Sequence, residues 1–255
     1  MSRALNLLAP IALVALLLAA WEAACRLLHV PPYLLPPPSA IVAAGVANAP
    51  VLLSSAWNTL SMALLALLCA SVFACTLALL VATNETLERT VQPLAVTIQV
   101  TPIVAIAPLV VIWAGFEHPE RATVILATVV AFFPIFSSAL TGFKSADPDL
   151  ERLFDLYGAN RLQRLFHLRL PAAVPFLLVG HKVAGSLAVV GAVVAEFVAG
   201  SGRSQGLAWR LIEAQNRLQT AKMFAALAVL AVMGAGLYGL LSAGEKAALH
   251  RWRGR

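Results

Sequence analysis

The sequence predicts an all-α membrane protein with six transmembrane helices. Of its 255 residues, 60% are hydrophobic and only 12% are charged. The mean hydropathy of +0.85 is far above that of a soluble domain of this length. Crossing ~30 Å of hydrocarbon takes roughly 20 apolar residues in a helix. Six segments meet this requirement, at residues 5–28, 60–82, 93–114, 122–143, 174–199 and 223–243.

The first segment follows Arg3 and carries Glu22 and Arg26 near its far end. Its apolar run is longer than the core of a signal peptide, and Glu22 stands where a cleavage site would lie, so we expect a retained helix. Five prolines then fall within 30–40. They disfavour a regular helix and favour a rigid, extended connector on the outer surface, followed by a mixed stretch as far as Trp57.

The third segment contains Pro93, Pro102 and Pro108, and the fourth contains Pro134. A proline inside a membrane helix removes a backbone hydrogen bond and bends the helix, so that neighbouring groups must satisfy the freed carbonyl. We therefore expect two kinked helices that face protein or water. Helix packing through small residues is the alternative explanation.

The fifth segment holds Lys182 and Glu196, which lie fourteen residues or roughly 21 Å apart on a helix and so cannot pair with each other. An ionisable side chain in hydrocarbon costs a few kcal/mol or more unless it faces a cavity or a partner. We expect both to make structural or gating contacts. The three cysteines lie in or beside apolar segments and indicate neither a disulfide nor a metal site.

Lysine and arginine counts predict that both termini are cytoplasmic, because retained positive charge marks that side of the membrane. With the N-terminus inside, inner segments hold eleven of these residues and outer segments hold six. The inner set is Arg3, Arg89, Lys144, Arg152, Arg161, Arg164, Arg169, Lys246, Arg251, Arg253 and Arg255, and the outer set is Arg26, Arg121, Arg203, Arg210, Arg217 and Lys222. This arrangement explains the net charge of +6 without a nucleic-acid partner.

The longest inner loop predicts a short helix outside the membrane. Asp147 is a suitable N-cap and Pro148 fits the first helical position. Asp149 and Glu151 favour the positive end of the helix dipole. Gly158 is expected to end the helix as a C′ glycine.

This helix is predicted to be amphipathic. Its apolar stripe has the spacing i, i+3, i+4 and i+7 and consists of Leu150, Leu153, Phe154 and Tyr157. The stripe fits either the bilayer surface or a hydrophobic groove on a partner protein. The mixed acids and bases on the polar face favour the groove. The basic residues that follow either retain the loop in the cytoplasm or pair with an acidic partner or anionic lipid; they are Arg161, Arg164 and Arg169.

The loop resembles the signature of membrane subunits of bacterial ATP-binding-cassette (ABC) importers, in which a helix and a glycine are followed by nine residues and then aliphatic–any–Leu–Pro. Here Gly158 is followed by nine residues and then by Leu168, Arg169, Leu170 and Pro171. The positions of the usual Glu-Ala-Ala hold Arg152, Leu153 and Phe154, and Glu151 is one place early. This departure suggests a bulkier apolar anchor in place of the acidic contact.

Other stretches resemble the permease branch of the nitrate, alkanesulfonate, taurine and thiamine-pyrimidine-precursor importers. They are "WEAACRLLHVPPYLLPPPSAIV", "TPIVAIAPLVVIWAGF", "FFPIFSSALTGFKSADPDL", "LPAAVPFLLVGHKVAGSLAVVGAVVAEFVAGSGRSQGLAW" and the terminal "RWR". Within this branch, the form "GAVVAEF" is more similar to permeases for thiamine pyrimidine precursors or similar heterocycles than to the sulfonate permeases.

The resemblance implies the type I ABC importer permease fold, in one domain over 1–255. Residues 1–57 would form the first helix and outer connector, 58–245 the permease core with a coupling loop at 144–171, and 246–255 a basic cytoplasmic tail. The implied partners are a second permease copy, two cytoplasmic ATPases that bind ATP and Mg, and a periplasmic binding protein at the bacterial inner membrane. The chain has no G-x-x-x-x-G-K-[ST] loop, so we expect that it is not itself the ATPase. We also expect no catalytic, cofactor or metal site in this chain.

The resemblance also assigns roles to residues. The helix 149–157 would sit in a cleft of the ATPase, and closure of the ATPase pair would rock the fourth and fifth spans. The expected coupling residues are Asp149, Leu150, Glu151, Leu153, Phe154, Tyr157, Gly158, Arg161, Arg164, Leu170 and Pro171. The residues expected along the translocation route or at its gate are Pro102, Pro108, Lys182 and Glu196.

Two other classes of protein are weighed against the importer. A secondary transporter or channel would need ionisable groups arranged along a pathway, and only Lys182 and Glu196 lie well inside a span. An intramembrane hydrolase would need a nucleophile with a base, or a metal pair, and the H-E-x-x-H motif is absent.

Overall fold

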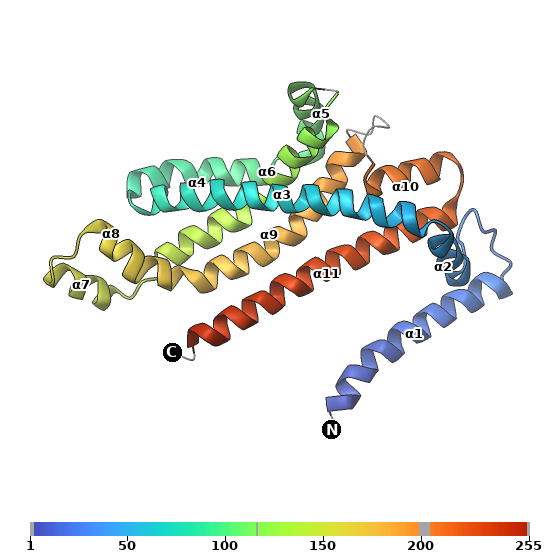
Figure 1. The fold of residues 1–255 in the computed structure, drawn as a ribbon, viewed down its shortest axis with the longest axis horizontal. Coiled ribbons are helices and arrows are strands. Elements are labelled where there is room, and N and C mark those ends of the chain that lie inside the picture. Colours follow the sequence, from blue (N-terminus) through green and yellow to red (C-terminus); the bar gives the residue numbers. More distant parts are fainter. Residues whose placement is uncertain (1–2, 116, 199–204, 254–255) are drawn as a thin grey trace. The chain divides into compact units, whose positions relative to one another are not determined.

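The computed structural model describes residues 3–115, 117–198 and 205–253, and every regular element within these ranges is helical (Figure 1). This confirms the all-α prediction. The chain forms two compact units. The first combines residues 1–57 with 205–231, and the second combines 58–204 with 232–255.

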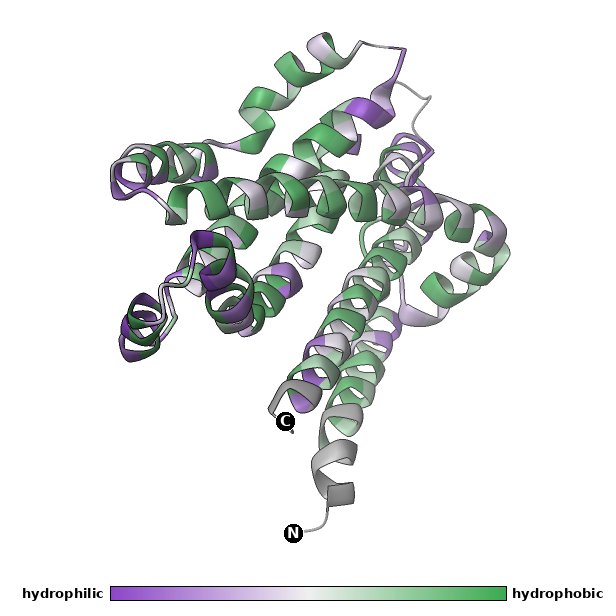
Figure 2. Ribbon diagram, turned by 60° about the vertical axis from the view of Figure 1, so that its left-hand side comes forward, coloured by the Kyte–Doolittle hydropathy of each residue, from purple (hydrophilic) through white to green (hydrophobic). Residues whose placement is uncertain are grey.

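Among the described residues, four helices are long and apolar enough to cross a membrane, and a fifth span results if the bent pair α4 and α5 crosses together. The four are α3 (Ala49–Ala82), α6 (Pro119–Phe143), the stretch Arg161–Val198 and α11 (Thr220–Arg253). The first predicted segment corresponds to α1 (Arg3–Leu27), which is 25 residues long. Apolar residues dominate these long helices, whereas hydrophilic residues gather on the short helices between 148 and 164 (Figure 2).

Small residues let α6 and α9 (Leu170–Val198) pack closely in the second unit. A Cβ atom added at Gly180 would lie 2.6 Å from the Cβ of Ser138, and one at Gly191 would lie 2.8 Å from the Cα of Ala127. Membrane helices associate through such small residues because the backbones can approach one another. The two helices therefore form the rigid centre of this unit.

The third predicted span is not one kinked helix. It is divided into α4 (Glu85–Val100) and α5 (Ile103–Ala114), which meet at an angle of 96°. Proline disfavours the α conformation of the residue before it, and Thr101 is extended, with ψ of 124°. Pro102 is also extended, with ψ of 113°. The expectation of a continuous helix over 93–114 was therefore wrong.

The outer connector contains more helix than predicted. Pro38 begins α2 (Pro38–Ala47), and α3 begins at Ala49, eleven residues before the predicted start at Leu60. Proline is well suited to the first helical position, because its missing N–H has no partner there in any helix. The Glu22 carboxylate of α1 accepts hydrogen bonds from the backbone N and the hydroxyl of Ser39, at 3.0 and 2.8 Å. Between α1 and α3, only 28–37 and Asn48 are not helical.

The second half of the loop at 144–171 is also helical, although only one short helix was expected there. α7 (Pro148–Leu156) is followed by α8 (Arg161–Arg164) and by the π-helix η1 (Leu165–Arg169), which runs directly into α9. Asn160 and Gln163 form a reciprocal capping box at the start of α8.

Two further differences concern the C-terminal third. α10 (Leu207–Asn216) was not predicted. The expected tail 246–255 is helical as far as Arg253, because α11 continues through it.

Candidate functional site

α7 has the caps that the sequence predicts. The Asp147 carboxylate accepts a hydrogen bond from Asp149 N at 2.8 Å, and Pro148 occupies the first helical position. At the other end, Gly158 has a φ of +64°. Ala159 N donates to Phe154 O at 3.0 Å, completing a Schellman motif.

The apolar stripe of α7 is not covered by its own chain, and none of the residues of α7 is buried. Leu150 and Leu153 are 45% and 44% exposed, and Tyr157 is 82% exposed. A shallow groove of about 390 Å³ runs along part of the stripe and is lined by Leu153, Phe154, Tyr157, Ala159, Gln163 and His167. The surface is therefore open to a partner or to the membrane.

The polar face of α7 is tied to the helices that follow it. Arg169 Nε donates to Glu151 Oε1 at 2.7 Å, and Arg164 forms an ion pair with Asp155. Arg164 also lies 4.0 Å from Glu151 Oε2. Arg164 and Arg169 thus have carboxylate partners in their own chain, which the sequence analysis did not predict. Arg161, at the start of α8, is exposed.

Leu170 and Pro171, the other predicted coupling residues, begin α9. The preceding residues form η1, a single turn of π-helix that we call the π-turn. In this turn Leu170 N donates to Leu165 O. Pro171 has no N–H and so donates no backbone hydrogen bond to the preceding turn, although the helical stretch is continuous from Arg161 to Val198. Pro171 therefore lies inside a helical stretch and not at the end of a loop.

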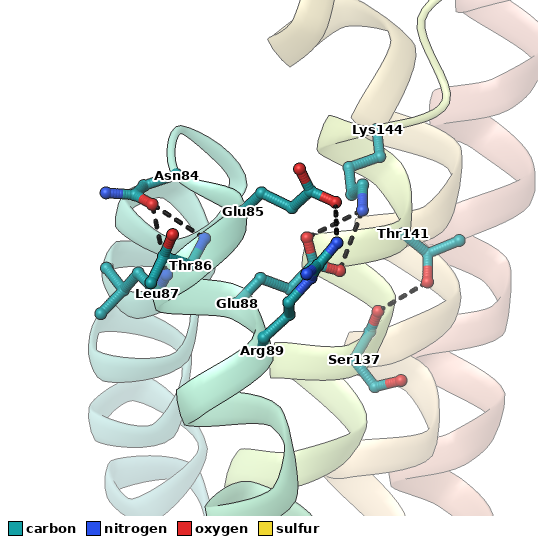
Figure 3. Close-up of polar contacts among 9 residues, drawn as sticks. All are labelled: Asn84, Glu85, Thr86, Leu87, Glu88, Arg89, Ser137, Thr141 and Lys144. Carbon is teal, nitrogen blue, oxygen red and sulfur yellow. Dashed lines mark hydrogen bonds and ion pairs between the residues drawn. The ribbon is translucent and has the colours of Figure 1, made fainter.

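A second ion pair lies beside the start of the loop (Figure 3). Lys144, which follows α6, donates to both carboxylate oxygens of Glu88 in the first turn of α4, at 2.9 and 2.8 Å. Ser145 Oγ donates to Gly142 O at 2.8 Å. These contacts join the ends of α4 and α6 next to α7. They were not predicted, because an ion pair between residues 56 apart leaves no pattern in one sequence.

Lys182 and Glu196 do not meet, as their spacing predicts. Lys182 Nζ donates to Glu245 Oε2 of α11 at 2.6 Å, and its ammonium lies 6.0 Å from the centre of the Tyr238 ring. Glu196 is fully buried and accepts a hydrogen bond from Thr59 Oγ1 of α3 at 2.7 Å. Both residues therefore join α9 to other helices.

The break between α4 and α5 forms part of a groove of about 390 Å³. Its wall includes Gln99, Thr101 and Pro102, together with Phe133 and Pro134 of α6 and Leu187 of α9. Pro108 lies farther along α5 and is not part of this wall. The structure thus places one of the two predicted route prolines beside the fourth and fifth spans.

In the first unit, α10 carries an ion-pair cluster around Glu213. Arg210 Nη1 donates to Glu213 Oε2 at 2.9 Å and lowers the pKa of this carboxyl below its usual value. The charges of Lys222 and Arg217 act in the same direction, and partial burial opposes them. Arg210 Nε also donates to Ser55 Oγ at 3.0 Å, so the cluster joins α10 to the start of α3.

Some sequence features lie outside the described residues. These include Ala199, the expected end of the fifth span, and Arg203 of the outer set. A G-x-S-x-G pattern, which also occurs in serine hydrolases, is present at 202–206, and only its last two residues are described. Within the described ranges, no group of three or more His, Cys, Asp or Glu side chains could hold a metal ion.

Comparison with known proteins gives the family. Residues 70–247 match the model of the binding-protein-dependent transport system inner membrane component family. A probable ABC transporter permease of Haemophilus influenzae is 32% identical over 92% of this chain and 94% of its own length. The formylaminopyrimidine transport permease ThiX of Halalkalibacterium halodurans is 31% identical over 92% of each chain. The taurine transport permease TauC of Escherichia coli is 28% identical over 86% of this chain and 81% of its own.

The fold is also shared with a solved structure. An inward-facing form of the MetNI methionine ABC transporter has a TM-score of 0.62 with this chain, at 18% identity, covering 77% of this chain and 95% of that chain. This likeness confirms the type I importer fold expected from the sequence. The chain therefore belongs to the family of binding-protein-dependent transport system inner membrane components, and it is a permease subunit of an ABC importer.

Proposed function

We propose that this permease pairs with a second copy of itself and receives two cytoplasmic ATPases on its α7 helices. The paired permeases move a small solute, delivered by a periplasmic binding protein, into the cytoplasm by alternating access. Family membership supports an ATPase and a binding protein as partners. The excess of inner lysines and arginines supports cytoplasmic termini in the inner membrane.

The exposed stripe of α7 is the observation that carries this proposal. Capping at both ends and ion pairs on one face hold the helix in place, while Leu150, Leu153 and Tyr157 remain open. A fixed amphipathic helix with apolar anchors at this spacing suits a groove on another protein. We therefore assign α7 as the surface that the ATPase grips.

The groove at the α4–α5 break is the candidate for the translocation route. It lies beside α6 and α9. In the chain, α6 precedes α7, and α9 follows α7 after α8 and η1. Discontinuous membrane helices often form the solute path of transporters, because their irregular backbone must line a cavity or be buried in protein. Pro102 lies at this break, and Pro108 follows it on α5. Lys182 and Glu196 act as structural or gating contacts.

The proposed solute is a thiamine pyrimidine precursor or a similar heterocycle. The ThiX relative, named for formylaminopyrimidine, aligns over nearly the whole of both chains. The "GAVVAEF" stretch, which includes the buried Glu196, supports the same choice. Cells that express the complete transporter can be given a labelled pyrimidine precursor or labelled taurine. The uptake of each compares the pyrimidine and the sulfonate class of solute directly.

Co-purification of the ATPase tests the proposal. We expect Leu153→Asp, in the middle of the stripe, to abolish capture of the ATPase by the tagged permease. Leu156→Asp is the matched control, because Leu156 is 84% exposed and lies outside the stripe. Equal capture by both variants would refute the docking role of α7, as would failure of the unchanged permease to capture any ATPase.

A further inference from the structure

Glu151 faces its own chain, unlike the other carboxylate near the start of α7. Its side chain is 23% exposed, whereas that of Asp149 is 84% exposed. One oxygen of Glu151 accepts from Arg169 at 2.7 Å, and the other lies 4.0 Å from Arg164. Asp155 completes the group through its ion pair with Arg164. We refer to Glu151, Asp155, Arg164 and Arg169 as the clamp.

The clamp holds α7 without covering its apolar stripe. Successive residues of an α-helix are separated by about 100°, so Glu151 and Asp155 lie about 40° apart on α7. The centre of the stripe is then about 130° away from them. One face is therefore bound to the chain and another remains free, as the exposure of Leu153 and Tyr157 shows.

The π-turn gives the two arginines a common direction. Residues five apart on a regular α-helix, as Arg164 and Arg169 are, point about 140° away from each other. In η1 the hydrogen bond from Leu170 N to Leu165 O spans five residues, so each turn holds more residues and the two side chains come closer to one face. Both guanidinium groups accordingly reach toward Glu151.

The segment between α7 and α8 is a weak path for force when α7 has no other contact. It turns the chain at Gly158, and a nine-residue helix such as α7 is only marginally stable in water without tertiary contacts. The Schellman motif at Gly158 holds the end of α7, and the clamp adds a direct connection from α7 to η1, which continues into α9. Coupling is therefore expected to need both the cap and the clamp.

We propose that Glu151 is a positioning residue for transport, which locks α7 to α8 through Arg164 and to η1 through Arg169, so that α7 and α9 move as one body. This rests on the proposed function, in which an ATPase moves α7. Glu151 therefore acts inside the permease and is not a contact for the ATPase. The stripe provides binding, and the clamp converts binding into movement of α9.

Charge reversal tests the clamp in the complete complex, reconstituted in liposomes with its ATPase and binding protein. We expect Glu151→Lys to capture the ATPase normally but to lower uptake per ATP hydrolysed about tenfold, within the range of coupling energies in a charged network. The swap Glu151→Arg with Arg169→Glu should restore the ratio to within about twofold. Glu85→Lys is the matched control, because its exposed pair with Arg89 (76% and 77% exposed) contributes little.

Hydrogen exchange of the permease alone provides a readout that does not need the ATPase. Amides of α7 should exchange about tenfold faster in Glu151→Lys than in the unchanged chain, and the swap should slow them again. Unchanged exchange and unchanged uptake in Glu151→Lys would overturn the clamp, as would a swap that restores neither. Lost ATPase capture in Glu151→Lys, without recovery in the swap, would make Glu151 a contact for the partner. Failure of the unchanged chain to capture ATPase would refute the proposed function and leave the exchange result to decide the clamp.

Discussion

Replacing Gly158 isolates the contribution of the α7 cap. An added Cβ would have no heavy atom within 4 Å, so the effect of a substitution arises from the backbone and not from a steric clash. At a φ of +64°, a residue with a side chain costs about 1–2 kcal/mol. This shifts the population of the native cap roughly 5- to 30-fold. Gly158→Val should therefore loosen the Schellman motif and weaken coupling between ATP hydrolysis and uptake.

The assay is ATP-dependent uptake by proteoliposomes, together with the amount of permease inserted. We expect Gly158→Val to insert normally and to lose most of its coupled uptake. Gly158→Asn is the matched control, because asparagine tolerates the left-handed conformation, and it should keep most of the uptake. Equal uptake by the valine and glycine forms would refute the argument, and so would equal losses in the valine and asparagine forms.

Three further predictions concern contacts away from α7. Lys182→Met should lower the Tm of the permease because it leaves Glu245 without its cation, and the double change with Glu245→Leu should recover most of that loss. Thr59→Val should lower the unfolding free energy by about 1–3 kcal/mol, because buried Glu196 loses a hydrogen bond. Thr59→Ser keeps the hydroxyl and should lower it less, and the Tm values of the two variants would show this order. Because the pKa of Glu213 is lowered from 4.5 in the fold, its contribution to stability is present above that pH and falls as the pH drops through the lowered value. Glu213→Gln should flatten the decline of Tm as the pH falls below 4.5, and an unchanged decline would refute the assignment.

Local patterns predicted α7 well, because each signal acts within a few residues. Asp147, Pro148 and Gly158 fix the two ends, and the hydrophobic spacing identifies the face that remains exposed. Bends were expected at Pro93, Pro102 and Pro108 of the third span, and only Pro102 lies at the break between two helices. Sequence reasoning treated it as a kink because a proline inside a membrane helix removes only one hydrogen bond. The pre-proline restriction acts on Thr101, but it acts equally on the residues before Pro93, Pro108 and Pro134, which remain helical, so it does not locate the break by itself.

Contacts between distant segments could not be predicted in this way. Glu151 finds Arg169, and Lys182 finds Glu245, only after the helices have packed. The sequence shows that each of these residues is charged, but it does not show which of the many oppositely charged residues is its partner. The π-turn was missed for the same reason, since no local pattern distinguishes five π-helical residues from the α-helix that follows them.

Photo-crosslinking from α7 tests the central claim most directly. A photoreactive residue at position 153, within the stripe, should crosslink to the ATPase in the assembled transporter, whereas the same residue at position 156 should not. Crosslinks from position 153 to lipid or to the permease itself, with none to the ATPase, would contradict the account.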